Sequence, residues 1–223
     1  MQTSYQAVRP LLCAECEQRF NHQGEDWVLK HCYRGYGLFR LRELLRASAP
    51  LHSDDNFTIY NAASVPRVSI EKLVYFCISV FWRSSVCEWE SSGEHYRAIS
   101  LGARYQEQIR NYLLGAVELP TSASILVLAS GLKTPAIVFT FPDTTRVESQ
   151  HCHSLHIPGL TFQLSLGGQV EREAVEASCI LRSSFHPIFQ CKHGDARAQR
   201  GVFKNMGKIA PPGAEYPIAE GIV

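Results

Sequence analysis

The sequence predicts an α+β protein in which helices come first and strands follow. Two observations support this prediction. Apolar residues recur at helical spacing between residues 69 and 89, which predicts a central buried helix. Beyond residue 123, short β-branched or alternating runs lie between glycines and prolines, as is typical of strands. At 223 residues, the chain can bury a substantial core as one large domain or two small ones.

Three further helical segments are expected in the first half of the chain. Residues 17–35 (EQRFNHQGEDWVLKHCYRG) show helical spacing after Gly24, so we expect one or two short helices that break at this glycine. Residues 39–47 place leucines on one face with arginines between them, which predicts an amphipathic helix. Residues 104–114 predict another helix, with Gly115 as its C-terminal stop.

Strands are expected at four places along the chain. A short strand is predicted at residues 57–60, and longer strands are predicted at residues 124–129, 136–141 and 160–166. These runs are rich in β-branched and aromatic residues, which fit the surface of a sheet. The second half of the chain is therefore expected to be β-rich.

The predicted organisation has three parts. Residues 1–50 are polar and carry a cysteine pair, so we expect a helical subdomain centred on a metal ion. Residues 51–200 are expected to form an α+β domain around the helix at 69–89. Residues 201–223, where glycines and prolines are spread through a polar segment, are expected to form a loosely packed tail.

Charge and hydropathy argue against two classes of protein. Lys plus Arg number 22 and Asp plus Glu number 21, so no excess of charge draws the chain to nucleic acid or to an anionic membrane. A nucleic-acid contact would need a local patch. The most apolar run, residues 68–86, contains Glu71, Lys72 and Arg83, which a membrane span does not tolerate. We therefore expect no contact with a membrane.

The eight cysteines indicate free thiols rather than disulfides. The first twelve residues, MQTSYQAVRPLL, contain no basic region followed by a long apolar run, so we expect no signal peptide. The expected location is the reducing cytoplasm. Cysteines there serve as metal ligands or as small buried apolar residues.

Cys13 and Cys16 are the strongest candidates for a metal site. A spacing of two residues lets one tight turn or one helical turn present both sulfurs to a tetrahedral zinc ion. Zinc needs four ligands, and the nearest residues that could complete the set are His22, His31 and Cys32. Two alternatives stay open. The cysteines could be ordinary small residues at a helix start, or a redox pair, although no βαβ unit of the kind that carries such pairs is evident.

The residues around this pair resemble a known zinc element. The string LLCAECEQRF, followed by GEDWV, resembles the second half of an HNH-type treble-clef module, in which a β-hairpin leads into a Cys pair at a helix start. The later strings KLVYFCISVFWRSSV and ISLGARYQEQIRNYLLG resemble a widespread, poorly characterised bacterial family that carries such an HNH-like element at its N-terminus. The resemblance spans roughly residues 8–166. It implies a structural zinc on Cys13 and Cys16, and a role near nucleic acid or in bacterial defence against phage.

The chain also departs from the HNH pattern. HNH-like modules begin with an earlier Cys pair and a His-containing strand whose imidazole activates the attacking water, and neither precedes Cys13. Glu17 stands where HNH nucleases commonly carry a metal-binding His. We therefore expect a degenerate or incomplete nuclease site, with Mg²⁺ or Mn²⁺ required only if the chain is a nuclease. The alternative is a non-catalytic module that binds another protein and uses zinc as a structural ion.

A second cluster of potential metal ligands comprises His151, Cys152, His153 and His156. On a strand, the first and third of these side chains would share one face, as a common metal ion requires. The alternative interpretation is a polar loop that enters the strand at 160–166, which the turn-forming Pro158-Gly159 favours.

Two further features are weaker candidates. His186, Cys191 and His193 could pack against residues 151–156 to form one composite site. Arg83 lies within the apolar stripe of the central helix, where an unpaired charge is unfavourable. Its partner is expected to be an acid such as Glu88 or backbone carbonyls, or alternatively a bound phosphate or carboxylate.

The arginines of the helix predicted at residues 39–47 are also candidates for binding an anion. Arg40, Arg42 and Arg46 could extend an anion-binding patch, although such runs of charge are usually solvated. The sequence contains no glycine-rich phosphate loop, no serine nucleophile elbow and no HExxH motif. It therefore gives no support to an enzyme of small-molecule metabolism.

Overall fold

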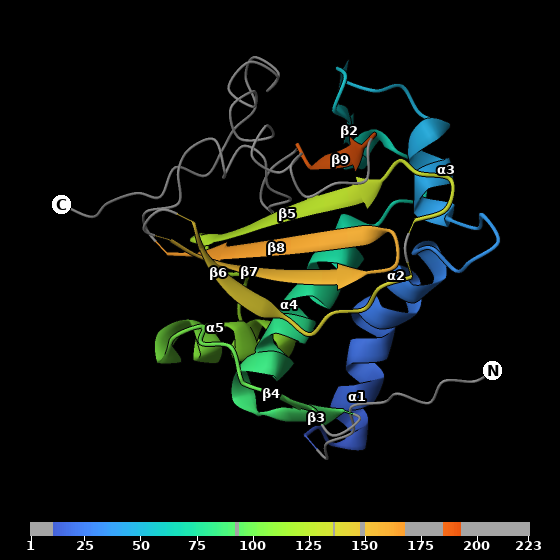
Figure 1. The fold of residues 1–223 in the computed structure, drawn as a ribbon. Helices are drawn as coiled ribbons and strands as arrows, with labels where there is room; N and C mark the ends of the chain where they lie inside the picture. The colour runs from blue at the N-terminus through green and yellow to red at the C-terminus, as the bar shows by residue number, and fades with distance from the viewer. Residues whose placement is uncertain (1–10, 92–93, 136, 148–149, 168–184, 193–223) are drawn as a thin grey trace.

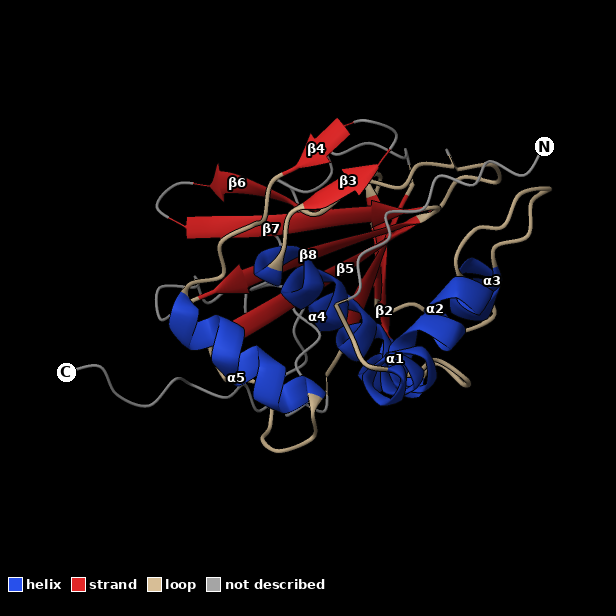
Figure 2. Ribbon diagram, turned by 90° about the horizontal axis from the view of Figure 1, so that it is seen from below, coloured by secondary structure: helices blue, strands red, loops and turns tan. Residues whose placement is uncertain are grey.

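A computed structural model describes residues 11–91, 94–135, 137–147, 150–167 and 185–192. These residues form one large sheet with helices packed against one of its faces (Figure 1 and Figure 2). The mixed α and β class predicted from the sequence is confirmed. Within this described part, no helix combines the length and the apolar character needed to cross a bilayer. The tail predicted at 201–223 lies outside the described residues.

The seven strands of the sheet are, in chain order, β1 (His52–Ser53), β2 (Phe57–Asn61), β5 (Ala123–Ser130), β6 (Asp143–Val147), β7 (Gln150–Ile157), β8 (Leu160–Leu166) and β9 (Pro187–Cys191). Across the sheet they follow the order β1-β2-β9-β5-β8-β7-β6. Neighbours are antiparallel except for β5 and β9, which run parallel. A separate hairpin pairs β3 (Trp89–Ser91) with β4 (Glu94–Tyr96).

The central helix α4 (Ile70–Val86) confirms the predicted buried helix and lies across the sheet (Figure 1). Ser69 begins it as the N-cap, because its side-chain oxygen accepts a hydrogen bond from the Lys72 amide at 3.3 Å. The helix ends at Val86 rather than at the predicted residue 89. Cys87 has an extended backbone, with φ −152° and ψ 157°, and this conformation leads the chain into β3.

The first helical run is continuous where the sequence predicts a break. It consists of α1 (Ala14–Phe20), the π-helical turn η1 (Asn21–Glu25) and α2 (Asp26–His31), and the backbone is helical at both junctions. The predicted break at Gly24 is therefore wrong. A Cβ atom at this position would lie 2.8 Å from the backbone nitrogen of Phe76, so the glycine permits a close crossing with α4 instead of ending a helix.

The other two predicted helices are confirmed. Helix α3 (Arg40–Arg46) buries Leu41 and Leu45, and helix α5 (Ala103–Leu113) packs against α4. Gly115 has a φ of +78°, the left-handed conformation that ends a helix at low cost in glycine. A 3₁₀ turn, η2 (Ala62–Ser64), follows β2.

One hydrophobic core joins the helices to the sheet. It includes Phe20 and Val28 from the first helical run, Phe76 from α4, and Ile125 and Phe162 from the sheet. The rings of Phe76 and Phe162 lie 5.6 Å apart, centroid to centroid. Residues from the predicted subdomain at 1–50 and from the predicted domain at 51–200 therefore share this core.

Three of the four predicted strands are confirmed, at 57–60, 124–129 and 160–166. The strands β1, β6 and β9 and the β3–β4 hairpin were not anticipated, and β7 was anticipated only as one of two interpretations of residues 151–156. Each of these missed strands is short or carries polar residues, so none shows the apolar alternation that identifies a strand in a sequence.

The strand predicted at 136–141 is wrong for the residues that the structure describes, which are 137–141. This segment connects β5 to β6, and Ile137 and Phe139 are each 66% exposed. A backbone hydrogen bond joins this segment to the sheet at Thr140, whose amide donates to the His156 carbonyl at 3.0 Å. Strand β6 follows directly and forms the regular pairing with β7, so the apolar segment before it is left at the surface.

Candidate functional site

Cys13 and Cys16 lie together at the start of α1. Cys13 is the N-cap residue, with φ −74° and ψ 161°, and its carbonyl accepts a hydrogen bond from the Glu17 amide at 3.0 Å. Cys13 is exposed and Cys16 is half-buried. The first helical turn therefore presents both thiols at the same place on the surface, as the spacing of the pair predicts.

The two thiols differ in acidity. The Cys13 side chain forms no capping hydrogen bond of normal geometry, but the nearby Cys16 amide and the Cys16 thiol lower the pKa of Cys13 by stabilising its thiolate. The same thiol–thiol contact, together with desolvation, raises the pKa of Cys16. Cys13 is therefore the first of the pair to ionise, and a thiolate is the form that binds zinc or attacks an electrophile.

We predict that Cys13 reacts faster with iodoacetamide than Cys16 or Cys191 in metal-free protein near neutral pH. A lowered pKa gives Cys13 the larger thiolate fraction, whereas burial raises the pKa of Cys191 to about 11 and leaves almost none. Mass spectrometry of peptides after brief labelling measures the three rates. Labelling of Cys16 ahead of Cys13 would contradict this order, and labelling of Cys191 would indicate that the protein had unfolded.

The other predicted ligands do not join this pair. Cys32 is buried in the core, and its thiol donates to the Leu29 carbonyl at 3.4 Å. The continuous helix places Cys32 on the order of 20 Å along its axis from Cys16, because each helical residue advances the chain by about 1.5 Å. Ligands of one zinc ion must all lie within about 2.3 Å of it. The structure therefore does not bring Cys32 into a shared site with the pair.

His31 is also engaged elsewhere. Its ring stacks on Trp27 with centroids 3.9 Å apart, and its Nδ1 donates to the Trp27 carbonyl at 2.7 Å. Burial lowers the pKa of His31, so its imidazole is neutral near pH 7. Taken over the described residues, no group of three or more His, Cys, Asp or Glu side chains is arranged to hold a metal ion.

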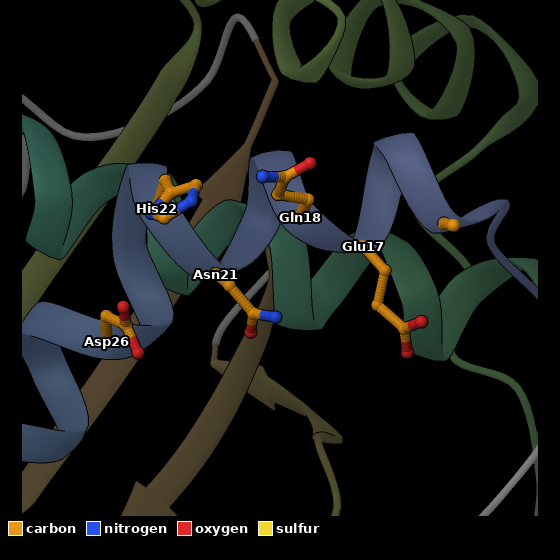
Figure 3. Close-up of a pocket in the computed structure, with 6 residues that line it drawn as sticks. Glu17, Gln18, Asn21, His22 and Asp26 are labelled. Carbon is orange, nitrogen blue, oxygen red and sulfur yellow. The ribbon is translucent and has the colours of Figure 1, made fainter.

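His22 is exposed and lines a shallow groove of about 430 Å³ beside the cysteine pair. The groove is lined by Ala14, Glu17, Gln18, Asn21, His22 and Asp26, which all come from the first helical run. Figure 3 shows these side chains spread along the helix rather than turned toward one point. Gln18, Asn21 and Asp26 were not anticipated, although polar residues three or four positions apart are the sequence signal for such a face.

The second predicted cluster lies on strand β7, so the interpretation as a polar loop is wrong. His153 is buried, with its Nδ1 hydrogen-bonded to the Thr144 hydroxyl at 2.8 Å. His156 is hydrogen-bonded to the Thr161 hydroxyl at 2.8 Å. The side chain of His151 lies outside the described residues.

The alternation of a strand also separates these ligands. His153 faces the helices, where its ring lies 6.1 Å from that of Phe81, whereas Cys152 and His156 point to the opposite face of the sheet. Cys152 interacts there with Ser165, and burial raises the pKa of its thiol. Cys152 and His156 therefore cannot share a metal ion with His153.

The predicted composite of this cluster with His186 and Cys191 is wrong. Cys191 lies on β9, and strands β5 and β8 stand between β9 and β7. Neighbouring strands are about 4.8 Å apart, so three spacings separate the two groups by roughly 14 Å. The third member, His193, lies outside the described residues.

No family model, no curated protein and no solved structure matches this chain. The resemblance to an HNH-like family therefore stays a prediction.

Arg83 pairs with an acid, as one of the two interpretations predicts, but the acid is Glu25 rather than Glu88. Its Nη2 forms an ion pair with Glu25, its Nε donates to the Ser79 carbonyl at 3.3 Å, and its guanidinium lies 5.5 Å from the ring centroid of Phe20. The two paired side chains are 23% and 20% exposed. The charge of Arg83 is thus compensated within the protein without a bound anion.

Two of the three arginines of α3 hold the segment after β5, whereas Arg40 is exposed. Arg42 donates to the carbonyls of Leu132 and Gly37, and Arg46 donates to the carbonyl of Gly131 at 2.7 Å. Arg42 is buried, so the expectation of a solvated run of charge is wrong for this residue. Both side chains fasten the segment after β5 to α3. Neither guanidinium therefore has all of its N–H groups available to bind phosphate.

Proposed function

We propose that this chain is a zinc-binding protein of HNH-like descent in which Cys13 and Cys16 are structural ligands. The observation that carries the proposal is the position of both thiols on one surface turn, where hydrogen bonds from Cys16 lower the pKa of Cys13. Two thiolates on one turn form a chelating pair with the donor type that zinc prefers. Zinc would supply a rigid tetrahedral link at the start of the helix.

The pair fits half of a structural zinc site. A closed site has four protein ligands, and His31 and Cys32 make their contacts elsewhere. We propose that the remaining ligands come from outside this turn.

The proposed role in catalysis is limited. A one-metal nuclease needs a general base and a metal ion beside the scissile phosphate. Glu17, His22 and Asp26 offer carboxylates and an imidazole that could hold Mg²⁺ or Mn²⁺, but they are spread along one helix (Figure 3). We therefore favour a degenerate nuclease site in a protein that acts near nucleic acid or in defence against phage. The cytoplasm is the compartment that keeps such thiols reduced.

A second candidate function is a non-catalytic module that binds another protein. It is favoured by the exposed apolar residues of the connection before β6, Ile137, Val138 and Phe139. The internal contacts of Arg42, Arg46 and Arg83 favour it as well, because these arginines are the residues that would otherwise bind phosphate.

Zinc content, measured by elemental mass spectrometry on untagged protein purified without added metal, tests the proposed function. We expect zinc in the wild type and its loss in the Cys13→Ser/Cys16→Ser double variant, because serine is a poor zinc ligand. Cys87→Ser is the matched control, since it removes a half-buried thiol at the C-cap of α4, outside the pair, and should keep the zinc. A wild type without zinc would refute the proposal and leave the protein-binding module as the better candidate.

A further inference from the structure

The cysteine pair presents a coordination problem that the described residues do not solve. Zinc in a structural site takes four protein ligands, and the first turn of α1 offers two. Residues 1–12 contain no Cys, His, Asp or Glu. Downstream of the pair, His31 is stacked on Trp27 and Cys32 is buried at the far end of the same helical run.

The nearest remaining side chains are poor partners. Glu15 forms an ion pair with Arg19 at 3.6 Å, and Glu17 and His22 lie along the groove. Throughout the parts of the chain that the structure describes, no three potential ligands meet. A zinc ion on Cys13 and Cys16 would thus keep two positions for ligands from elsewhere.

We propose that two copies of this chain share one zinc ion, with Cys13 and Cys16 of each copy as its four ligands. This inference rests on the proposed zinc function and names the source of the two missing ligands. A two-fold axis through the ion relates the copies, so the same surface serves on both sides. Each copy brings a chelating pair held on one turn, and the second pair replaces water with the sulfur ligands that zinc prefers.

The surface around the pair leaves room for a second copy. Cys13 and the neighbouring Ala14, Glu15, Glu17 and Gln18 are all exposed. The pair stands at the beginning of α1, where Cys13 is the N-cap residue.

Charge makes this association depend on the metal. Glu15 and Glu17 lie beside the pair in each copy, and among the described residues Arg19 offsets part of this charge by its ion pair with Glu15. Without a cation, the two acidic turns repel each other when they approach. A zinc ion between four thiolates supplies the attraction, so removal of zinc should separate the copies.

The test measures molar mass by light scattering and zinc content on the same reduced sample of full-length protein. We expect one zinc ion per two chains and twice the chain mass of 25.0 kDa. A chelator should remove the zinc and return the mass to that of one chain. The reducing agent excludes dimers linked by a disulfide.

Variants and a second metal sharpen the test. Cys13→Ser/Cys16→Ser should stay monomeric and metal-free with an unchanged circular dichroism spectrum, because these thiols lie at the surface, whereas Cys87→Ser should still form the zinc dimer. Cobalt in place of zinc should show the charge-transfer absorption of four thiolates rather than two.

Each outcome decides between the two proposals. One zinc ion per monomeric chain would overturn the shared site and leave the zinc function standing. Absence of zinc would overturn both. A dimer that survives the chelator or the double substitution would also overturn the shared site, because the copies would then associate through another surface.

Discussion

Replacing Gly24 with valine is expected to lower the free energy of unfolding by about 3 kcal/mol or more. Gly24 lies where the first helical run crosses α4, and a Cβ atom there would be 2.8 Å from the nitrogen of Phe76 and 3.0 Å from its Cα. These atoms belong to the backbone of a buried helix, so they cannot move aside as a flexible side chain could. Urea denaturation followed by circular dichroism measures the change.

The matched control for this substitution is Gln23→Val. Gln23 is exposed on the same π-helical turn, so it reports the effect of a β-branched residue in that turn without the crossing. We expect it to lower stability by less than about 1 kcal/mol. Equal effects of the two valines would mean that the helices do not approach each other this closely in solution.

Replacing Arg83 with methionine is expected to lower the free energy of unfolding by about 2 kcal/mol. Removal of one partner of a buried ion pair costs about 3 to 5 kcal/mol, and partial exposure of Arg83 and Glu25 reduces this figure through solvent screening. The substitution also removes the contact of the guanidinium with the Phe20 ring. Thermal and urea unfolding of the variant measure the loss.

A double-mutant cycle with Glu25→Gln separates the ion pair from the packing. We expect the double variant to lose about 1 kcal/mol less stability than the two single variants lose together, because each single variant leaves one charge without its partner.

The control pair is Arg110 and Glu107, which lie 3.3 Å apart and are 51% and 60% exposed. Arg110→Met should cost less than about 0.5 kcal/mol. If Arg83→Met were as stable as the wild type and showed no coupling energy with Glu25→Gln, Arg83 would again be a candidate for binding an anion.

The helices could be predicted from the sequence because their signals are local. The apolar stripe that defines α4 repeats every three to four residues, and the capping side chain of Ser69 lies directly before it. Gly24 shows the limit of this approach. Its sequence neighbours suggest a helix break, but its role depends on the Phe76 backbone, which is remote in the chain.

Strands depend on partners that the sequence does not reveal. Strand β9 contains Pro187 and Gln190 and shows no clear alternation, yet it lies in the interior of the sheet because β2 and β5 flank it. Residues 137–141 have the opposite character. They are strongly β-forming by composition, but no ladder includes them, so residues 137–139 stay exposed and Thr140 and Phe141 are only half-buried.

Only the local part of the candidate site could likewise be predicted from the sequence. The spacing of Cys13 and Cys16 is enough to predict one helical turn that carries both thiols. The partner of Arg83 could not be predicted, because Glu25 lies 58 positions away and meets it only through the crossing of two helices. The separation of Cys191 from β7 likewise follows from the order of the strands, which no local pattern encodes.

The place of β9 in the sheet has a consequence for biosynthesis. Among the described strands, β9 joins β1 and β2 on one side to β5, β8, β7 and β6 on the other. Until residues 187–191 leave the ribosome, β2 and β5 each present an unpaired edge on which a neighbouring nascent chain could pair. Completion of the sheet is thus a late event with distant contacts, which slows folding. The growing chain must therefore protect two open edges between the synthesis of β5 and that of β9.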